Sequence, residues 1–292
     1  MKARLGLLCA TLLFFASCGD SGSDACDNAC SASQLAASLS SEHTPANGAL
    51  LESLIGNELG SEPFYLVEYW RLDPDNPEAE ALLARYDEVL APQLELVGAR
   101  IALDNVVFNQ PTMFEGREWS RVRILSWPSP QAFLEVLQTE AYQQAIQWKH
   151  QATLALQSLW VETVFAARIV DPFPDKAEFY NSNLLTPRDV ALYPDGTSGG
   201  LTGAEASKLY NDVVREIFAE IGAYAAFQGS VKHLVLGTDD QWEIYNLVYY
   251  PSIPDMLAMT TDPRFLAVRP NKGAGLSRNS VMMTRPLIDP EL

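Results

Sequence analysis

The chain has 292 residues, of which 48% are hydrophobic and 20% charged, so it is long enough for two modest domains and can bury a core. Its formal net charge is −17, from 37 acidic and 20 basic residues. A polyanion such as DNA would be repelled, because nucleic-acid binding depends on a Lys/Arg footprint that this sequence lacks. The composition therefore argues against nucleic acid as a partner.

The first 17 residues have the layout of a secretory signal. Lys2 and Arg4 form a short basic head, and residues 5–16 form an apolar stretch that is too short to span a bilayer. The stretch ends in Phe15-Ala16-Ser17-Cys18, which resembles the lipobox of bacterial lipoproteins, although Phe15 stands where Leu is usual. An ordinary signal peptide, cleaved after Ser17 or a nearby small residue, is the alternative.

The lipoprotein resemblance implies that Cys18 becomes the first mature residue and carries acyl chains, palmitate among them, on its thiol and amine. Each buried CH₂ contributes about 0.8 kcal/mol, so several acyl chains hold such a protein on a membrane. Retention signals for the inner membrane place Asp directly after the cysteine, whereas Gly19 follows Cys18 in this chain. We therefore expect a lipid-anchored protein of the bacterial cell envelope, in the outer membrane and facing the periplasm.

Residues 18–62 predict a tether and one short helix. Residues 19–48 are rich in Ser, Ala, Asp and Gly without a sustained hydrophobic period, and residues 49–57 predict a helix lying on the folded part. Cys26 and Cys30 are spaced C-x₃-C in an oxidising compartment, where pairing is allowed. A closed metal site would need about two more ligands nearby, so we expect a local disulfide.

Residues 63–170 predict a first folded unit. Phe64–Leu72 is aromatic and β-branched enough for a strand, and residues 78–97 have apolar residues at helical spacing. Further strands are expected over residues 99–108, 119–127 and 159–169, with helical segments after Ser129 and around Tyr142. The order is β-α-β-β-α-β, that of a ferredoxin-like unit.

Residues 187–288 predict a second unit with the same order. A strand is expected over residues 190–193, and Thr202 and Glu205 form a capping box that begins a helix ending at Gly222. Strands over residues 223–236 and 242–250, a helix after Ser252 and a last strand over residues 280–285 follow. The fold class is therefore α+β, with two tandem ferredoxin-like units.

A constant spacing shows that the second unit is a copy of the first. Trp119 and Trp242 are 123 residues apart, as are Lys149 and Lys272, and the phrases EWSRVRILSWPS and QWEIYNLVYYPS begin at the same offset. Tyr86 and Tyr210 are 124 apart, which indicates a one-residue slip in a loop. Each unit would cover one sheet face with helices and leave the other bare, so we expect the two sheets to pack against each other within a monomer.

The first unit resembles the family called domain of unknown function 1330 (DUF1330). The resemblance rests on residues 118–145, EWSRVRILSWPSPQAFLEVLQTEAYQQA, with a strand, Pro128-Ser129, a helix and an acidic-x-Tyr-Gln turn. The second unit matches more loosely, with Asp262-Pro263-Arg264-Phe265. That family resembles the dimeric α+β barrel superfamily, which implies that the two units form one barrel as an intramolecular pseudo-dimer.

Two neighbouring strands of the first unit carry candidate catalytic residues. Glu68 lies on the first strand and Arg121 and Arg123 on the third, and we expect these strands to be adjacent and parallel. Glu68 would act as a base and an arginine would stabilise an oxyanion. A structural ion pair is the alternative. Candidate ligand-binding residues are Trp70, Trp119, Trp127 and His150.

No metal and no cofactor are expected. The three histidines, His43, His150 and His233, form no H-x-H or H-E-x-x-H pair. Three functions stay open: an envelope lipoprotein that binds a small organic ligand, a cofactor-independent monooxygenase or isomerase acting on an anionic or enolisable substrate, and a structural protein that contacts an envelope partner. The sequence does not decide whether the chain is an enzyme.

Overall fold

The computed structural model describes residues 31–112, 118–166, 178–239 and 241–287. The predicted signal peptide, the lipidation of Cys18 and the pairing of Cys26 with Cys30 lie outside these residues. Within the described ranges, no helix has the length and apolarity needed to cross a bilayer.

The folded part begins earlier than the sequence predicts. Helix α1 (Ala32–Leu39) occupies a segment that was interpreted as tether, and that interpretation is wrong from residue 31 onward. Ser31 and Gln34 form a capping box at its start, and Leu35 and Leu39, one turn apart, are fully buried against the first unit. Helix α2 (Gly48–Ile55) confirms the predicted short helix.

The first unit has the predicted order. Ser129 caps one helix by accepting a hydrogen bond from the Ala132 amide, and Thr139 caps the next in the same way. The last strand begins six residues before its expected start. The elements are β1 (Phe64–Leu72), α3 (Ala79–Leu96), β2 (Arg100–Thr112), β3 (Arg121–Trp127), α4 (Pro130–Leu137), α5 (Glu140–Ala152) and β4 (Thr153–Ala166).

The second unit repeats this order, but its first strand lies elsewhere than predicted. Residues 190–193 form no strand beyond a single bridge between Val190 and Thr202, and the strand is β5 (Phe179–Pro187). Asn181, Ser182 and Asn183 interrupt its apolar pattern, which hid it from a reading of the sequence. The other elements are α6 (Gly203–Ile221), β6 (Tyr224–Leu236), β7 (Ile244–Tyr250), α7 (Ile253–Thr261), α8 (Pro263–Gly275) and β8 (Leu276–Pro286).

The two sheets join edge to edge into one closed barrel in the order β1-β3-β2-β8-β5-β7-β6-β4. Strand β4 pairs with β6 and β2 pairs with β8, so each unit contributes four neighbouring strands. Strands β1 and β3 are adjacent, as expected, but antiparallel, and the prediction of a parallel pair is wrong. A helix returns the chain between β1 and β2, and the β2–β3 hairpin then reverses it, so β3 runs against β1.

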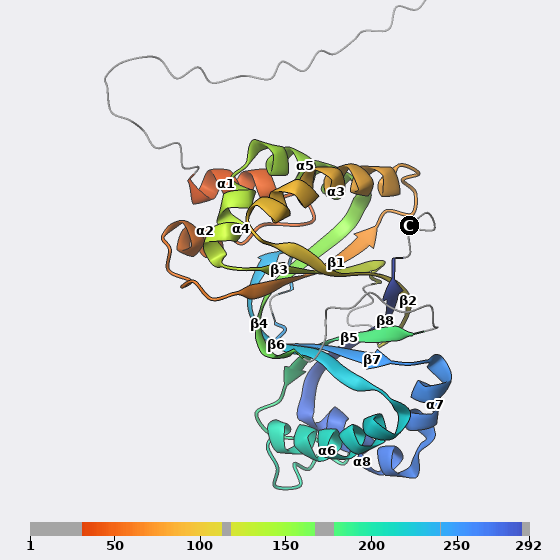
Figure 1. Cartoon of the computed structure of the whole chain (residues 1–292). Coiled ribbons are helices and arrows are strands. Elements are labelled where there is room, and N and C mark those ends of the chain that lie inside the picture. Colours follow the sequence, from red (N-terminus) through yellow and green to blue (C-terminus); the bar gives the residue numbers. More distant parts are fainter. Residues whose placement is uncertain (1–30, 113–117, 167–177, 240, 288–292) are drawn as a thin grey trace, which may run out of the picture.

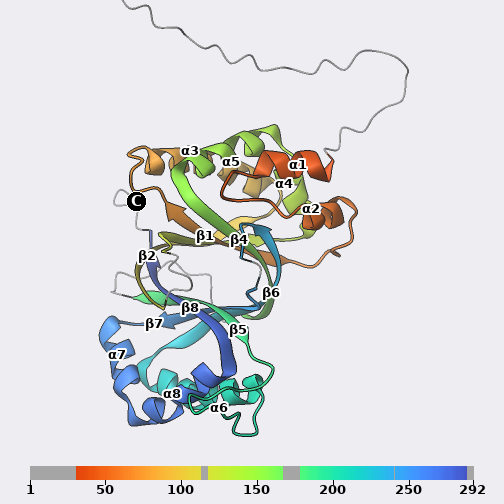
Figure 2. The same cartoon turned by 180° about the vertical axis from the view of Figure 1, so that it is seen from behind.

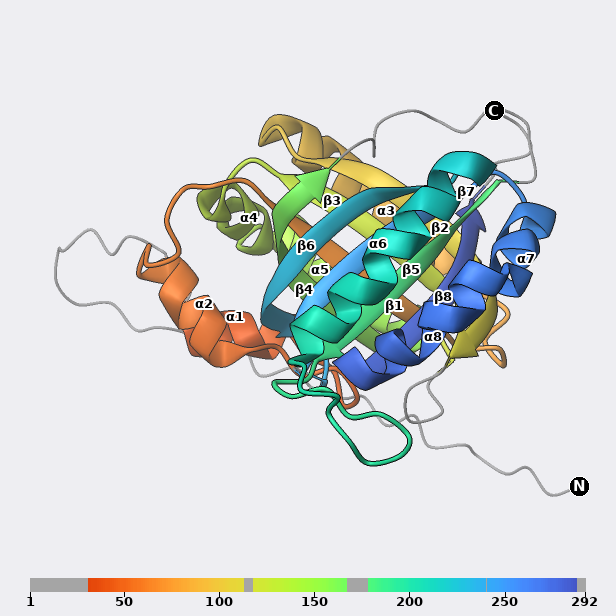
Figure 3. The same cartoon turned by 90° about the horizontal axis from the view of Figure 1, so that it is seen from below.

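Helices cover the outside of the barrel on two opposite sides (Figures 1 and 2). Helices α1 to α5 lie over the first unit and α6, α7 and α8 over the second. Seen from the second unit, α6 and α8 run side by side across the strands (Figure 3). Each side therefore has its own layer between helices and sheet, separate from the barrel interior.

Aromatic and aliphatic side chains from both units pack in the barrel interior. The hydroxyl groups of Tyr69 and Tyr245, from opposite units, each lie 3.2 Å from Ser182 Oγ. All three side chains are fully buried. The interior thus acts as the core that joins the units.

The seam between β4 and β6 predicts a stability effect at Gly229. A Cβ there would lie 2.3 Å from Val161 Cγ1 and 2.7 Å from the Glu162 carbonyl oxygen. We expect Gly229→Ala to lower the free energy of unfolding in urea by about 1–3 kcal/mol, because the seam would have to shift. Gly273→Ala, in α8 with nothing within 4 Å of the added Cβ, is the control and should not destabilise. Equal stability of the two variants would contradict the tight seam.

Candidate functional site

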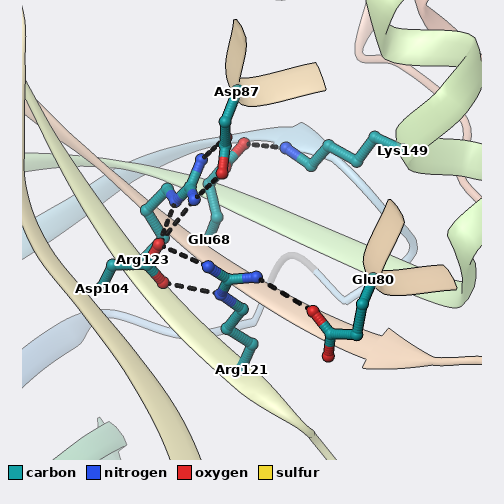
Figure 4. Close-up of polar contacts among 7 residues, drawn as sticks. All are labelled: Glu68, Glu80, Asp87, Asp104, Arg121, Arg123 and Lys149. Atoms are coloured by element: carbon teal, nitrogen blue, oxygen red, sulfur yellow. Dashed lines mark hydrogen bonds and ion pairs between the residues drawn. The ribbon is translucent and has the colours of Figure 1, made fainter. Parts of the chain in front are cut away.

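A buried ion-pair network lies within the layer between helices and sheet in the first unit, beside its apolar core (Figure 4). Arg121 Nε donates to Asp104 Oδ1 at 2.7 Å, and Arg123 bonds both Asp104 and Asp87. Lys149 Nζ lies 2.7 Å from Glu68 Oε1, to which Ser158 also donates a hydrogen bond. The network joins α3, α5 and three strands, and its cations are paired with carboxylates.

The structure brings together four of the residues selected from the sequence, on the helix side of the sheet. The indole ring of Trp70 has three cations around it: Arg123 Cζ at 4.5 Å, Lys149 Nζ at 4.7 Å and Arg121 Cζ at 5.0 Å from its centroid. Trp70 is fully buried beside Glu68 on β1. Cation–π attraction adds to the ion pairs, so this cluster is held by mutual compensation of charge.

The protonation of the network follows from its pairing. Burial acts to raise the pKa of Asp104, but the guanidinium groups of Arg123 and Arg121 outweigh it and hold that pKa below its usual value. Burial lowers the pKa of Lys149, and the Glu68 carboxylate opposes this effect. The site therefore resembles a structural network more than an acid–base pair that is open to substrate.

The other residues predicted as ligand-binding lie apart from this cluster. Trp119 contacts Tyr69 with ring centroids 5.7 Å apart, whereas Trp127 packs against Phe64 and Phe133 in the first unit's core. The imidazole Nε2 of His150 lies 2.9 Å from the carbonyl oxygen of Leu39, which ties α5 to the end of α1. These three side chains share no common space with Glu68.

Histidine offers no centre for a metal in the part of the chain that the structure covers. His43 is exposed, and His233 lies on β6 with its ring 6.1 Å from that of Trp160. No group of three or more His, Cys, Asp and Glu side chains that could hold a metal ion occurs among the described residues.

A cavity of about 1190 Å³ occupies the corresponding layer of the second unit. It lies between the outer face of the second sheet and helices α6, α7 and α8 (Figure 3 shows these elements). Much of its wall is apolar. The apolar lining includes Val214, Phe218, Val248, Tyr250, Met256, Met259, Phe265 and Met283.

The polar part of the cavity wall consists mainly of amides. Two charged residues also line it, Lys272 from α8 and Arg215 from α6, and none of the described lining residues is Asp or Glu. The absence of carboxylates stands out in a chain with 37 acidic residues. The amide side chains are those of Asn109, Asn181, Asn183, Asn211, Gln228 and Asn246.

Strand register shows that this cavity replaces the ion-pair network. Glu68 faces Arg123 across β1 and β3, and Asn183 faces Asn246 across β5 and β7. Asp104 also faces Arg123, and Gln228 faces Asn246. Each amide thus stands where the first unit has a charged side chain.

Further charged residues of the first unit are also replaced by neutral ones in the second unit. Asn211 follows Tyr210 as Asp87 follows Tyr86, and Ile244 stands at the position of Arg121. Lys272 alone keeps its charge, at the position of Lys149. Shorter or neutral side chains cannot span the layer by ion pairs as the first unit does, which explains how the cavity arises.

Some polar atoms of residues that line the cavity have no hydrogen-bond partner. Asn183 Nδ2 donates to the backbone carbonyls of Asn181 and Asn246, at 3.0 and 3.2 Å. The side-chain oxygens of Asn181 and Asn246 are buried and have no hydrogen-bond partner. Buried polar atoms of this kind require an explanation, and a bound molecule is one.

Comparison with known proteins adds similarity in fold. No family model and no curated protein matches the chain. A protein of unknown function from Rhodopseudomonas palustris is 25% identical over 40% of this chain and 96% of its own, with a TM-score of 0.35. A candidate monooxygenase from Fusobacterium nucleatum is 12% identical over 78% of this chain and 94% of its own, with a TM-score of 0.49.

A chlorite dismutase from Candidatus Nitrospira defluvii is 10% identical, over 81% of this chain and 95% of its own, with a TM-score of 0.41. This chain has the α+β barrel fold. The strand order establishes that fold directly, and at these identities a shared fold carries no activity with it.

The ion-pair network predicts a large effect of neutralising one partner. We expect Glu68→Gln to lower the free energy of unfolding by about 3–5 kcal/mol, because it leaves the buried ammonium of Lys149 without its carboxylate. The double variant Glu68→Gln with Lys149→Met should recover much of that loss in urea unfolding. A double variant less stable than Glu68→Gln alone would contradict mutual compensation.

Asp104 predicts a pH dependence of stability. Its pKa is lower in the folded state than in the unfolded state, so its contribution is present above the unfolded value of about 3.9 and is lost as pH falls through the folded value. We expect Asp104→Asn to be less stable than the wild type at pH 7 and the difference to shrink below about pH 4. A difference that does not change between pH 7 and pH 3 would contradict the pairing.

Proposed function

We propose that this protein binds a small organic molecule in the cavity of the second unit. The observation that carries the proposal is the cavity itself, with apolar walls, several amides and one lysine at positions where the first unit is filled by ion pairs. Ligand pockets occupy about 300–1,000 Å³, are mostly apolar and have a few polar groups that orient the ligand. The cavity has this composition, and its volume of about 1190 Å³ lies somewhat above that range.

The location of the cavity agrees with a binding role. Helices α6, α7 and α8 and the sheet form its walls, so regular secondary structure would hold a ligand on several sides. The barrel interior and the first unit have separate hydrophobic cores that do not include the cavity. Part of the cavity lining also belongs to the hydrophobic cluster of the second unit, and a bound ligand would complete the packing of that layer.

An enzyme that uses Glu68, Arg121 and Arg123 is the second candidate. The similarity in fold to a candidate monooxygenase is compatible with it. The geometry favours a structural role, because these three side chains are buried and paired and none of them lines the cavity. Catalysis at Glu68 stays a prediction, as does a structural role for the whole protein in the envelope.

The proposal includes the placement of the protein. The resemblance of residues 15–18 to a lipobox supports a lipid anchor at Cys18 in the outer membrane. Membership of the first unit in the DUF1330 family, which its sequence resembles, is likewise part of the proposal. The closed barrel formed by one chain supports a monomer, since both units that would form a dimer are present.

The proposal predicts that filling the cavity removes the ligand. Val248 is buried and lines the cavity, and Val248→Trp should occupy much of the space. Native mass spectrometry of the full chain purified from its host should show a retained small molecule on the wild type and none on this variant. Val190→Trp is the control, because Val190 is exposed and does not line the cavity.

Two results would contradict the proposal. One is a wild-type protein without any retained molecule that also fails to take up an added apolar dye. The other is a molecule that Val248→Trp retains as well as the wild type does.

A further inference from the structure

Lys272 has lost the carboxylate that its counterpart in the first unit uses. Lys149 Nζ lies 2.7 Å from Glu68 Oε1, and the register of the strands puts Asn183 at the position of Glu68. An amide can accept a hydrogen bond but carries no charge. The position equivalent to the Glu68 carboxylate is therefore occupied by a neutral amide in the second unit.

An aromatic ring lies beside Lys272 as one lies beside Lys149, although Lys149 is fully buried and also lies over Trp70, whereas Lys272 is partly buried. Lys272 Nζ lies 5.6 Å from the ring centroid of Tyr210, and Lys149 Nζ lies 4.9 Å from that of Tyr86. Tyr210 contacts Phe265 as Tyr86 contacts Tyr142, at 5.9 and 6.3 Å between centroids. The lysine is thus held in the same place, at the cavity wall, by the same kind of ring.

The charge of Lys272 is not compensated within the described part of the protein. Burial lowers the pKa of its ammonium, and the nearby guanidinium of Arg269 lowers it further. No ion pair of Lys272 occurs among the described residues, and none of the described lining residues is acidic. A charge removed from water is stabilised by an opposite charge, and in this cavity the ligand can supply one.

We infer that the ligand is an amphiphilic organic anion whose negative group binds Lys272 at the position that the Glu68 carboxylate takes in the first unit. This inference rests on the proposed function and specifies its ligand. Both Asn183 Nδ2 hydrogens already bond backbone carbonyls, but the side-chain amides of Gln228 and Asn246 line the same cavity and can donate hydrogen bonds to an anionic oxygen. The apolar body of the ligand lies between Phe218, Met259 and their neighbours.

A pair of dyes separates the charge from the apolar body. The anion 1-anilinonaphthalene-8-sulfonate and neutral N-phenyl-1-naphthylamine share one aromatic skeleton and differ in the sulfonate. The full chain is titrated with each dye, and native mass spectrometry gives the fraction of protein that carries it. Each dye is compared only with itself across variants, so differences in how the two dyes survive ionisation cancel.

Lys272→Met should weaken the anionic dye by about tenfold or more and change the neutral dye by less than about twofold, because a desolvated charge pair is lost and the apolar wall is kept. Lys208→Met is the matched control. Lys208 is exposed on α6 and does not line the cavity, so it removes the same charge from the protein without changing the site.

Asn183→Asp tests the same point by adding the missing carboxylate. It should form an internal pair with Lys272 as Glu68 does with Lys149, and thereby exclude the anionic dye while the neutral dye still binds. Thermal unfolding by circular dichroism verifies that each variant folds. Retained binding of the neutral dye shows that the cavity itself is intact in each variant.

Each remaining outcome decides against the inference. If Lys272→Met weakens both dyes equally, or neither, Lys272 is part of the wall and the inference fails while the binding function stands. If neither dye binds the wild type, the inference and the proposed function fail together. If Asn183→Asp keeps the anionic dye, the anion does not occupy the position of the Glu68 carboxylate.

Discussion

A lysine held between a helix and a sheet needs a counter-charge, and the two units meet this constraint in different ways. In the first unit Glu68 supplies the carboxylate to Lys149, and Asp87 and Asp104 neutralise Arg123 beside it. In the second unit the lysine remains and the carboxylates are absent from the equivalent positions. The ion-pair network of the first unit and the cavity of the second therefore occupy equivalent positions.

The closed barrel allows the units to differ. Strand pairing of β4 with β6 and of β2 with β8 leaves no free edge, and the interior is packed with side chains from both units. Each outer layer then has a separate hydrophobic cluster against its own helices. A loss of packing over the second sheet is therefore tolerated, since the interior and the first unit retain their cores. In the proposed function, one layer of the duplicated fold is filled and the other binds a ligand.

The sequence predicted the repeated unit well and the site only in part. The constant offset between Trp119 and Trp242 located both units, and Glu68 with Arg121 and Arg123 was correctly placed on adjacent strands. Strand β5 was missed because its asparagines face the cavity instead of a core. Alternation alone also could not predict which face of β1 points into the barrel and which points toward the helices. Both faces of this strand are apolar and aromatic. The cavity had one signal in the sequence. At the constant offset between the two units, charged residues of the first unit are replaced by amides in the second.

The most direct test of this account is a crystal structure of the protein with 1-anilinonaphthalene-8-sulfonate bound. The account predicts the aromatic rings between the second sheet and helices α6 to α8, with a sulfonate oxygen within hydrogen-bond distance of Lys272 Nζ. A dye bound in the first unit, or one whose sulfonate points away from Lys272 into solvent, would contradict it.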